Sequence, residues 1–170
     1  FIVGDHQGTS PESHYKLAEE VLDVAKHYES KMVYTLGGFG TGHLPKKPKV
    51  FGAVTHKSLK KPLERLGVSF EKTGGGIVGA AGLLIGLGER RGMKGICLMG
   101  ETHGQIIDAR AAKAILEVLN PLLGLNVDTS ELEKRAKETE RALERIKRTE
   151  EQRRFLESLP HTSEGPEYIR

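Results

Sequence analysis

Two glycine-rich segments are the parts of this sequence best suited to binding chemistry, because glycine lets a backbone approach a ligand closely. The first, Leu36-Gly-Gly-Phe-Gly-Thr-Gly42, follows an apolar run that predicts a strand. Its backbone N–H groups could form a nest for an anion, and the candidate residues are Gly38, Gly40, Thr41 and Gly42. It lacks the Gly-Lys-Ser/Thr ending of a phosphate-binding P-loop, which argues against nucleoside triphosphate hydrolysis. A structural loop at the end of a strand explains the same residues.

The second segment matches the G-x-G-x-x-G pattern of dinucleotide-binding folds with Gly74, Gly76 and Gly79. Glu101 lies 22 residues beyond Gly79, just past the next predicted strand, where such folds place the acid that binds a ribose hydroxyl. The preceding strand is short, however, and the following helix contains too many glycines for an ordinary helix of that fold. Close packing of helices on the sheet is the competing explanation, and it requires no cofactor.

Side chains for catalysis or metal binding are sparse. The polar groups at the predicted strand ends are Asp5, His6, His43, Glu101 and His103. None of them has the spacing of an H-E-x-x-H zinc helix, and the sequence contains no G-x-S-x-G nucleophile elbow. We therefore expect no metal and no enzymatic activity, with these groups satisfying loop backbone instead.

The glycine segments lie within an alternation of predicted strands and helices. Strands are predicted over residues 1–3, 32–36, 50–54, 68–70, 95–99 and 125–127. Helices are predicted over 9–28, 58–66, 77–91, 108–119 and 130–159. Thr9 and Glu12 have the spacing of a capping box for the first helix, and Asp108 is a candidate N-cap. This alternation predicts an α/β fold with a largely parallel sheet between layers of helices.

The composition fits a single domain. A length of 170 residues is enough for a real core. With 29% charged residues and a net charge of +3, the surface has mixed signs, so we expect no nucleic-acid partner. No apolar run reaches the length of a membrane span, so no membrane association is expected. The single cysteine, Cys97, lies in a predicted buried strand and cannot form an internal disulfide, which fits a reducing cytoplasm.

The composition changes near residue 128. We therefore divide the chain into an α/β core (1–127), a charged helix (128–159) and a flexible tail (160–170). Oppositely charged pairs four residues apart, such as Glu131 with Arg135, support an exposed helix. A narrow apolar stripe runs along it through Leu132, Ala136, Thr139, Leu143 and Ile146. Because the stripe is too weak for an autonomous coiled coil, we expect an arm that packs on the domain or on a neighbouring subunit.

Several motifs occur in the order seen in the proteasome assembly chaperone 2 family. They are Gly4-Asp5 with Gln7, Tyr34 to Gly42, Val50-Phe-Gly52, Gly74 to Ala80, and Gly92 to Thr102. The match covers the chain from Phe1 to the start of the charged helix. The sequence resembles an archaeal member of this family.

The resemblance implies a three-layer α/β/α sandwich similar to that of nucleoside phosphorylases, without their activity. It also implies that an N-terminal strand and a glycine-containing segment of the domain are missing, as the abrupt apolar start at Phe1 suggests. Members of the family form homo- or hetero-oligomers and help to assemble the α-ring of the proteasome. The expected partners are therefore proteasome α-subunits, further copies of this chain, or another member of the family.

The resemblance also draws attention to the tail. Some members dock a C-terminal hydrophobic-Tyr-X tail between α-subunits, with its carboxylate on a lysine and the tyrosine ring buried. The last residues here are Tyr168, Ile169 and Arg170, so the tyrosine is third from the end rather than second. Three functions remain open: a proteasome assembly chaperone, a ligand-binding or enzymatic domain that uses the second glycine segment and Glu101, and a scaffold for another family member.

Overall fold

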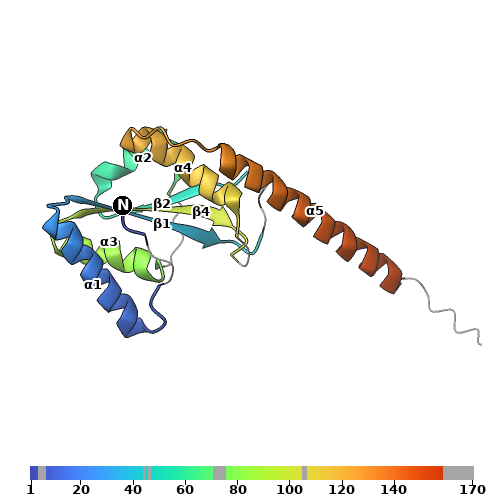
Figure 1. Ribbon diagram of the computed structural model, residues 1–170, viewed down its shortest axis with the longest axis horizontal. Helices are drawn as coiled ribbons and strands as arrows, with labels where there is room; N and C mark the ends of the chain where they lie inside the picture. The colour runs from blue at the N-terminus through green and yellow to red at the C-terminus, as the bar shows by residue number, and fades with distance from the viewer. Residues whose placement is uncertain (4–6, 44, 46, 71–75, 105–106, 159–170) are drawn as a thin grey trace, which may run out of the picture.

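A four-stranded sheet forms the centre of the molecule (Figure 1). The computed structural model describes residues 1–3, 7–43, 45, 47–70, 76–104 and 107–158. The strands are β1 (Met32–Gly40), β2 (Val50–Val54), β3 (Val68–Ser69) and β4 (Lys94–Thr102), in the order β1-β4-β2-β3. β1 pairs in parallel with β4 and β2 with β3, whereas β2 and β4 are antiparallel. The predicted α/β class with a mostly parallel sheet is confirmed.

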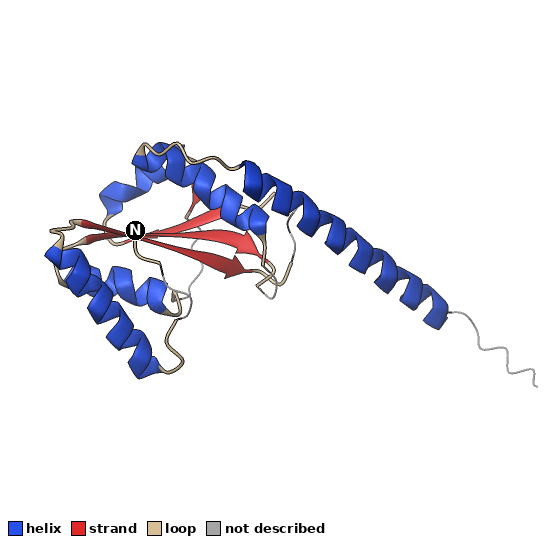
Figure 2. Ribbon diagram, viewed as in Figure 1, coloured by secondary structure: helices blue, strands red, loops and turns tan. Residues whose placement is uncertain are grey.

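Helices lie against both faces of this sheet (Figure 2). On one face, α3 (Ala80–Arg90) packs on β1 and β4, and α1 (Pro11–His27) packs on α3. On the other, α4 (Ala109–Leu123) packs on β4 and β2. The short η1 (Lys57–Leu59) and α2 (Lys60–Arg65) lie on the same side as α4.

Two glycines of β4 let helices approach the sheet from opposite faces. A Cβ at Gly95 would come within 2.8 Å of the Ile85 side chain on α3. A Cβ at Gly100 would come within 2.7 Å of the Ala111 carbonyl oxygen on α4. Because residues five apart in a strand point to opposite faces, the two contacts belong to the two sides of the sheet.

The glycines of α3 serve close packing only in part. Gly88 faces Leu22 of α1, whose Cδ2 would lie 3.4 Å from an added Cβ. Gly86 points to open space, with nothing within 4 Å of an added Cβ. The Gly88 distance is an ordinary van der Waals contact, so neither Gly88 nor Gly86 is required for close packing, whereas an added Cβ at Gly82 would collide with the Ile77 carbonyl oxygen.

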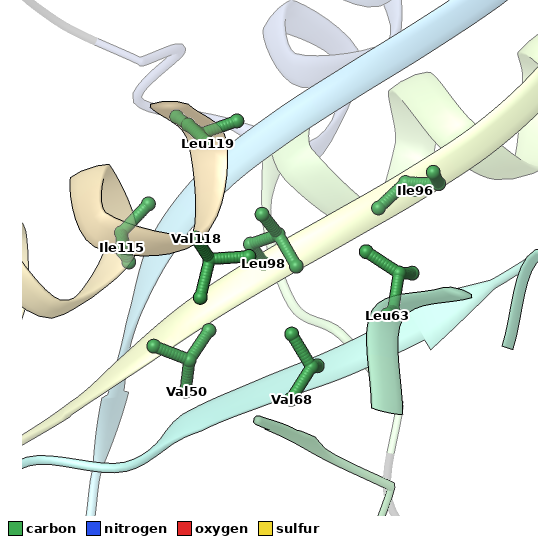
Figure 3. Packing of buried hydrophobic residues seen from close by; sticks show 8 residues of the cluster. All are labelled: Val50, Leu63, Val68, Ile96, Leu98, Ile115, Val118 and Leu119. Carbon is green, nitrogen blue, oxygen red and sulfur yellow. The ribbon is translucent and has the colours of Figure 1, made fainter. Parts of the chain in front are cut away.

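An apolar cluster fills the space between the sheet and the helices α2 and α4 (Figure 3). Leu98 of β4 is completely buried within it. On α4, Ile115 faces the strands together with Val118 and Leu119, which lie three and four positions later, as the helical period predicts. The buried members are Val50, Leu63, Val68, Ile96, Leu98, Ile115, Val118 and Leu119.

Residues that are evident in the sequence cap both ends of α4. The Asp108 carboxylate accepts a hydrogen bond from the backbone N–H of Arg110 at 3.0 Å. Gly124 ends the helix in the left-handed region, with φ 63°. The helix runs to Leu123, beyond the predicted end at residue 119, and passes through Pro121. A proline this close to the end removes only one helical hydrogen bond.

α1 begins one residue later than the predicted capping box. Ser10, not Thr9, is the N-cap, and its Oγ accepts from the Ser13 backbone N–H at 3.2 Å. The Ser13 Oγ in turn accepts from the Ser10 backbone N–H at 2.9 Å, so Ser13 takes the place predicted for Glu12. Pro11 occupies the first helical turn, where its missing N–H is not needed.

Two predicted strands do not form. Phe1 and Val3 are almost fully exposed, and residues 1–3 pair with no strand of the described sheet. Residues 125–127 are a linker instead. There the Asn120 side-chain amide donates to the Val127 carbonyl oxygen at 3.1 Å and accepts from the Val127 N–H at 3.3 Å. This side chain therefore occupies the backbone groups that a strand ladder would need.

α5 (Ser130–Ser158) extends away from the body as the charged arm that the sequence predicts (Figure 1). The Asp128 carboxylate accepts from the Ser130 N–H at 2.9 Å and from its hydroxyl at 2.6 Å, which fixes the start of the helix. The predicted pair of Arg135 with Glu131 forms at 3.2 Å. None of the helices in the described ranges is both long and apolar enough to cross a membrane.

Candidate functional site

The first glycine segment lies mainly in a strand and not in a loop, contrary to prediction. β1 continues to Gly40, in register with β4, so that Gly38 stands beside Gly100 and Gly40 beside Thr102. Pairing with β4 holds these glycines in an extended conformation, which glycine by itself does not favour. A Cβ at Gly40 would come within 3.3 Å of the Gly104 Cα, so glycine allows two backbones to lie close together here.

Two of the four anion-nest candidates follow the end of β1. The Thr41 N–H donates to the Thr102 carbonyl oxygen at 2.9 Å, and is therefore already engaged by the protein. Gly42 is exposed and has φ 71°, a conformation that favours glycine. Anion binding by these residues stays a prediction, and the geometry gives it little support because the nest needs several free N–H groups in succession.

Glu101 lies inside β4 and not beyond it, contrary to prediction. Its Oε2 accepts from the Lys49 backbone N–H at 3.1 Å, and its own N–H donates to the Lys49 carbonyl oxygen at 2.8 Å. Both contacts hold the residue that precedes β2. The side chain is thus a structural partner of the neighbouring strand.

The second glycine segment leads to the N-terminus of α3. Gly74 lies outside the described residues, and Gly76 is exposed with nothing within 4 Å of an added Cβ. Gly79 precedes α3 with φ 88°, so the helix begins at Ala80 and not at residue 77 as predicted. The Ala80 N–H donates to the Gln7 Oε1 at 3.2 Å. A dinucleotide-binding fold would offer this helix end to a pyrophosphate, whereas here a side chain of the protein occupies it.

The strand order also differs from that of a dinucleotide-binding unit. In such a unit, the strands before and after the glycine-rich helix are parallel neighbours. Here β3 and β4 are separated by β2, which is parallel to β3 and antiparallel to β4. β3 and β4 therefore run in opposite directions, and their carboxyl ends lie at opposite ends of the sheet. The strand order therefore gives no support to a dinucleotide site built from the G-x-G-x-x-G pattern and Glu101, and ligand binding by these residues stays a prediction.

Two polar atoms near the carboxyl end of β4 are buried without a hydrogen-bond partner among the residues that the structure describes. They are the Thr102 Oγ1 and the His103 Nδ1. His43, by contrast, is exposed, and Asp5 and His6 lie outside the described residues. Within the described ranges, no three His, Cys, Asp or Glu side chains are placed to hold a metal ion.

A buried ion pair beside α4 was not predicted from the sequence. The Arg110 Nε and Nη2 donate to the two Asp108 carboxylate oxygens at 2.9 and 2.8 Å, and Nη1 donates to the Pro45 carbonyl oxygen at 3.2 Å. Both charged residues are about nine-tenths buried. Hydrogen bonding to Asp108 raises the pKa of Arg110. The pair fastens residue 45 to α4, and an Asp-x-Arg sequence alone carries no such signal.

The arm is the most prominent surface feature. α5 packs on α4 near its start, where Ala136 is buried, and then projects from the body (Figure 2). The Lys113 Nζ bridges Glu117 at 3.0 Å and Glu133 of α5 at 3.2 Å, and these hydrogen bonds raise the pKa of Lys113. The tail residues Tyr168, Ile169 and Arg170 lie outside the described residues, so their docking role stays a prediction.

Solved structures of archaeal proteins resemble this chain closely. Pyrococcus furiosus PbaB, described as an archaeal proteasome activator, is 40% identical with a TM-score of 0.78. The match covers 85% of this chain and 63% of PbaB. Pyrococcus furiosus PbaA, described as an archaeal homolog of proteasome-assembly chaperone, is 36% identical with a TM-score of 0.73. That match covers 89% of this chain and 64% of PbaA.

The sequence comparisons agree. The uncharacterized protein MJ1210 of Methanocaldococcus jannaschii is 48% identical over 147 residues, which is 86% of this chain and 57% of that protein. The chain thus spans less than two thirds of the length of these relatives. The model of the PAC2 family matches residues 2–147, across the core and the first turns of α5. The chain therefore belongs to the PAC2 family.

Proposed function

We propose that this protein is a non-enzymatic proteasome assembly chaperone or activator that binds proteasome α-subunits in the cytoplasm as a homo-oligomer. The observation that carries the proposal is the 40% and 36% identity to PbaB and PbaA, together with their shared fold. The proposal is argued from the part of PbaB and PbaA that this chain matches, 63% and 64% of their lengths.

The geometry of the glycine segments supports a binding role over catalysis. Gln7 occupies the helix end that would receive a phosphate, and Glu101 is engaged by the backbone of Lys49. We infer a three-layer core of the nucleoside phosphorylase type that uses its glycines for packing. The active surface would then be the exterior of the core, the arm and the tail.

The tail docks in this proposal through Tyr168, Ile169 and the carboxylate of Arg170. A tyrosine ring supplies a large apolar surface, and a free carboxylate pairs strongly with a lysine. α5 supports the proposal because it starts on the core and leads away from it (Figure 1). A helix of 29 residues at about 1.5 Å per residue carries the tail roughly 45 Å from its base.

The test is binding to the α-subunits of the source organism, measured by co-purification and native mass spectrometry. The chain is compared with a variant that lacks residues 160–170, and with Tyr168→Ala as the smaller change. We expect binding by the intact chain and a clear loss in both variants. If binding survives both changes, the tail is not the docking element. If no form binds α-subunits or assembled proteasomes, the proposed function is wrong.

A second candidate partner is another member of the same family. It is favoured by one observation: PbaA and PbaB are two related proteins of a single organism, Pyrococcus furiosus. A scaffold role would then rest on a hetero-oligomer. Pull-down from the source organism, with identification of every bound protein by mass spectrometry, separates the two candidates. Recovery of a paralogue without proteasome subunits supports the scaffold, and recovery of α-subunits without a paralogue removes it.

A further inference from the structure

The base of the arm is a short antiparallel pair of helices. Near the turn, Asn120 of α4 binds Val127 of the linker, and farther along, Lys113 of α4 pairs with Glu133 of α5. The facing residues are spaced by about one turn on each helix, so each set lies on one face. They include Lys113, Ala114 and Glu117 of α4 and Glu133, Ala136 and Glu140 of α5.

This seam is mostly polar and incompletely filled. Its residues line an open groove of about 570 Å³ together with Lys47 and Pro48 of the preceding loop. Ala136 is buried to 8% exposure, and it contributes only a methyl group. No large apolar side chain of α5 is buried in the described part of this seam. In the described part of the seam, hydrogen bonds and ion pairs therefore outweigh apolar burial.

In the described part of the seam, hydrogen bonds and ion pairs act at two points along α4, and the Arg110 guanidinium also attracts the Glu140 carboxylate of α5. The Asn120 amide holds both backbone groups of Val127, which fixes the linker. The Lys113 ammonium, seven residues earlier, holds the Glu133 carboxylate and is itself steadied by Glu117. Seven residues of helix are roughly 10 Å long, so two anchors at this spacing define a direction and not only a position. Removing either one would leave the arm attached but free to swing.

The other pair of packed helices in the core provides a contrast. α1 and α3 meet through the completely buried Leu22, which contacts Gly88, and Arg91 at the end of α3 adds exposed ion pairs to Glu19 and Asp23 of α1. Apolar burial does not weaken when salt is added. The Lys113 pairs are partly exposed, at 29% for Lys113 and 49% for Glu133, and salt screens such pairs. Salt screens the Arg91 pairs as well, but the buried contact of Leu22 remains, so α1 should keep its place on α3 when the arm does not.

We propose that the base of α5 is a salt-sensitive clamp. At low ionic strength, Lys113 and Asn120 together hold the arm in one direction relative to the core. When salt screens the Lys113–Glu133 pair, the arm stays helical and remains tethered through Asn120, but samples a wider range of directions. This inference goes beyond the proposed function because it concerns the chain alone, with no proteasome subunit present.

The experiment measures distances between two spin labels by pulsed electron paramagnetic resonance. Cys97→Ala removes the native thiol, and labels are placed at the exposed positions Lys61 of α2 and Glu144 of α5. A second pair at Lys61 and Glu89, an exposed residue of α3, reports on the core. Labelled chain is mixed with excess unlabelled chain, so that contacts between copies do not add distances.

The variants separate the clamp from the helix itself. Lys113→Met removes the bridging charge, whereas Arg135→Met removes a pair that lies wholly within α5. We expect a narrow arm distance at low salt, and a distribution about twice as wide in 1 M salt or in Lys113→Met. Arg135→Met should keep the narrow distribution. Exchanging the charges with Lys113→Glu and Glu133→Lys together should restore it.

Three results would overturn the clamp. One is a broad arm distribution in the unmodified chain at low salt. Another is a distribution that Lys113→Met and high salt leave unchanged. The third is a core distance that broadens together with the arm distance, because the change would then reflect unfolding. Circular dichroism of each variant establishes that helix content is retained.

Discussion

Gly100 of β4 lies directly against the backbone of Ala111 in α4. A Cβ at Gly100 would stand 2.7 Å from the Ala111 carbonyl oxygen, a distance at which one of the two must move. A carbonyl within a helix cannot turn aside as a flexible side chain can. This contact therefore sets the distance between α4 and the sheet, and with it the packing of the apolar cluster around Leu98.

We predict that Gly100→Ala lowers the free energy of unfolding by about 1–3 kcal/mol, as overpacking does in other cores. Gly86→Ala is the matched control, because nothing lies within 4 Å of its added methyl group. That change should raise stability by about 0.5–1 kcal/mol, since alanine favours a helix over glycine. Urea unfolding of both variants checks this. Equal effects at the two positions would show that α4 can move away from β4 without cost.

Arg110 and Asp108 form a buried pair, and such pairs are costly to break. We expect Arg110→Met to lower the free energy of unfolding by about 3–5 kcal/mol, because it leaves the Asp108 charge buried and uncompensated. Asp108→Asn keeps an N-cap oxygen while removing that charge. Added to Arg110→Met, it should recover part of the loss. Lys60→Met, which breaks an exposed pair with Glu64, should cost less than about 1 kcal/mol. A double-mutant cycle from unfolding curves measures the coupling between Arg110 and Asp108. Additive effects of the two substitutions would contradict the buried pair.

The start of α1 provides a test at two adjacent residues. Ser10→Ala should cost about 1 kcal/mol of stability, because it removes the oxygen that accepts from the Ser13 N–H. Thr9→Ala should leave stability within about 0.5 kcal/mol, since Thr9 is not the N-cap. Thermal unfolding of the two variants gives the comparison. A larger loss of stability in Thr9→Ala than in Ser10→Ala would show that Thr9 is the N-cap, as its spacing to Glu12 predicts.

Cys97 makes stability depend on alkaline pH. Burial raises the pKa of its thiol above the usual value of 9.0, so the folded protein keeps this proton at a pH where the unfolded chain loses it. The stabilisation from the neutral thiol is complete below the unfolded pKa, and is lost as pH rises through the folded one. The free energy of unfolding should therefore fall above about pH 9 more steeply in the native sequence than in Cys97→Ala.

Unfolding in urea at several pH values, from neutral to about pH 10, measures the difference between the two chains. Below pH 8, a thiol reagent should modify Cys97 only at the rate of unfolding. Rapid modification of the folded protein would show that Cys97 is accessible. Identical dependence of stability on pH in the native sequence and in Cys97→Ala would show that the thiol does not contribute to it.

Local features could be predicted from the sequence because their causes lie within a few residues. Asp108 and Gly124 mark the two ends of α4, and the apolar period of α4 identifies the face that packs around Leu98. The burial of Cys97 follows in the same way from its apolar neighbours. Errors at this level are small, such as the shift of the α1 cap from Thr9 to Ser10.

The meaning of the glycine segments could not be predicted in this way. Glycine weakens an isolated strand, yet β1 continues through Gly37 to Gly40 because β4 pairs with it. Glu101 has the sequence spacing of a ribose-binding acid, but β2 lies between β3 and β4 and brings Lys49 to its carboxylate. The ion pair of Arg110 with Asp108 and the bridge from Lys113 to Glu133 could not be predicted either, because the surrounding sequence gives no signal for these contacts.

The sequence by itself determined the helices and most strands, the α/β class, the buried cysteine and the charged arm, since local propensity and hydrophobic period are sufficient for these. Only the tertiary structure decided which strands are neighbours, where α3 begins, and what each glycine and carboxylate touches. The physical reason is that hydrogen bonds between strands and contacts between helix and sheet join residues far apart in the chain, and a spacing pattern cannot report which of these contacts form.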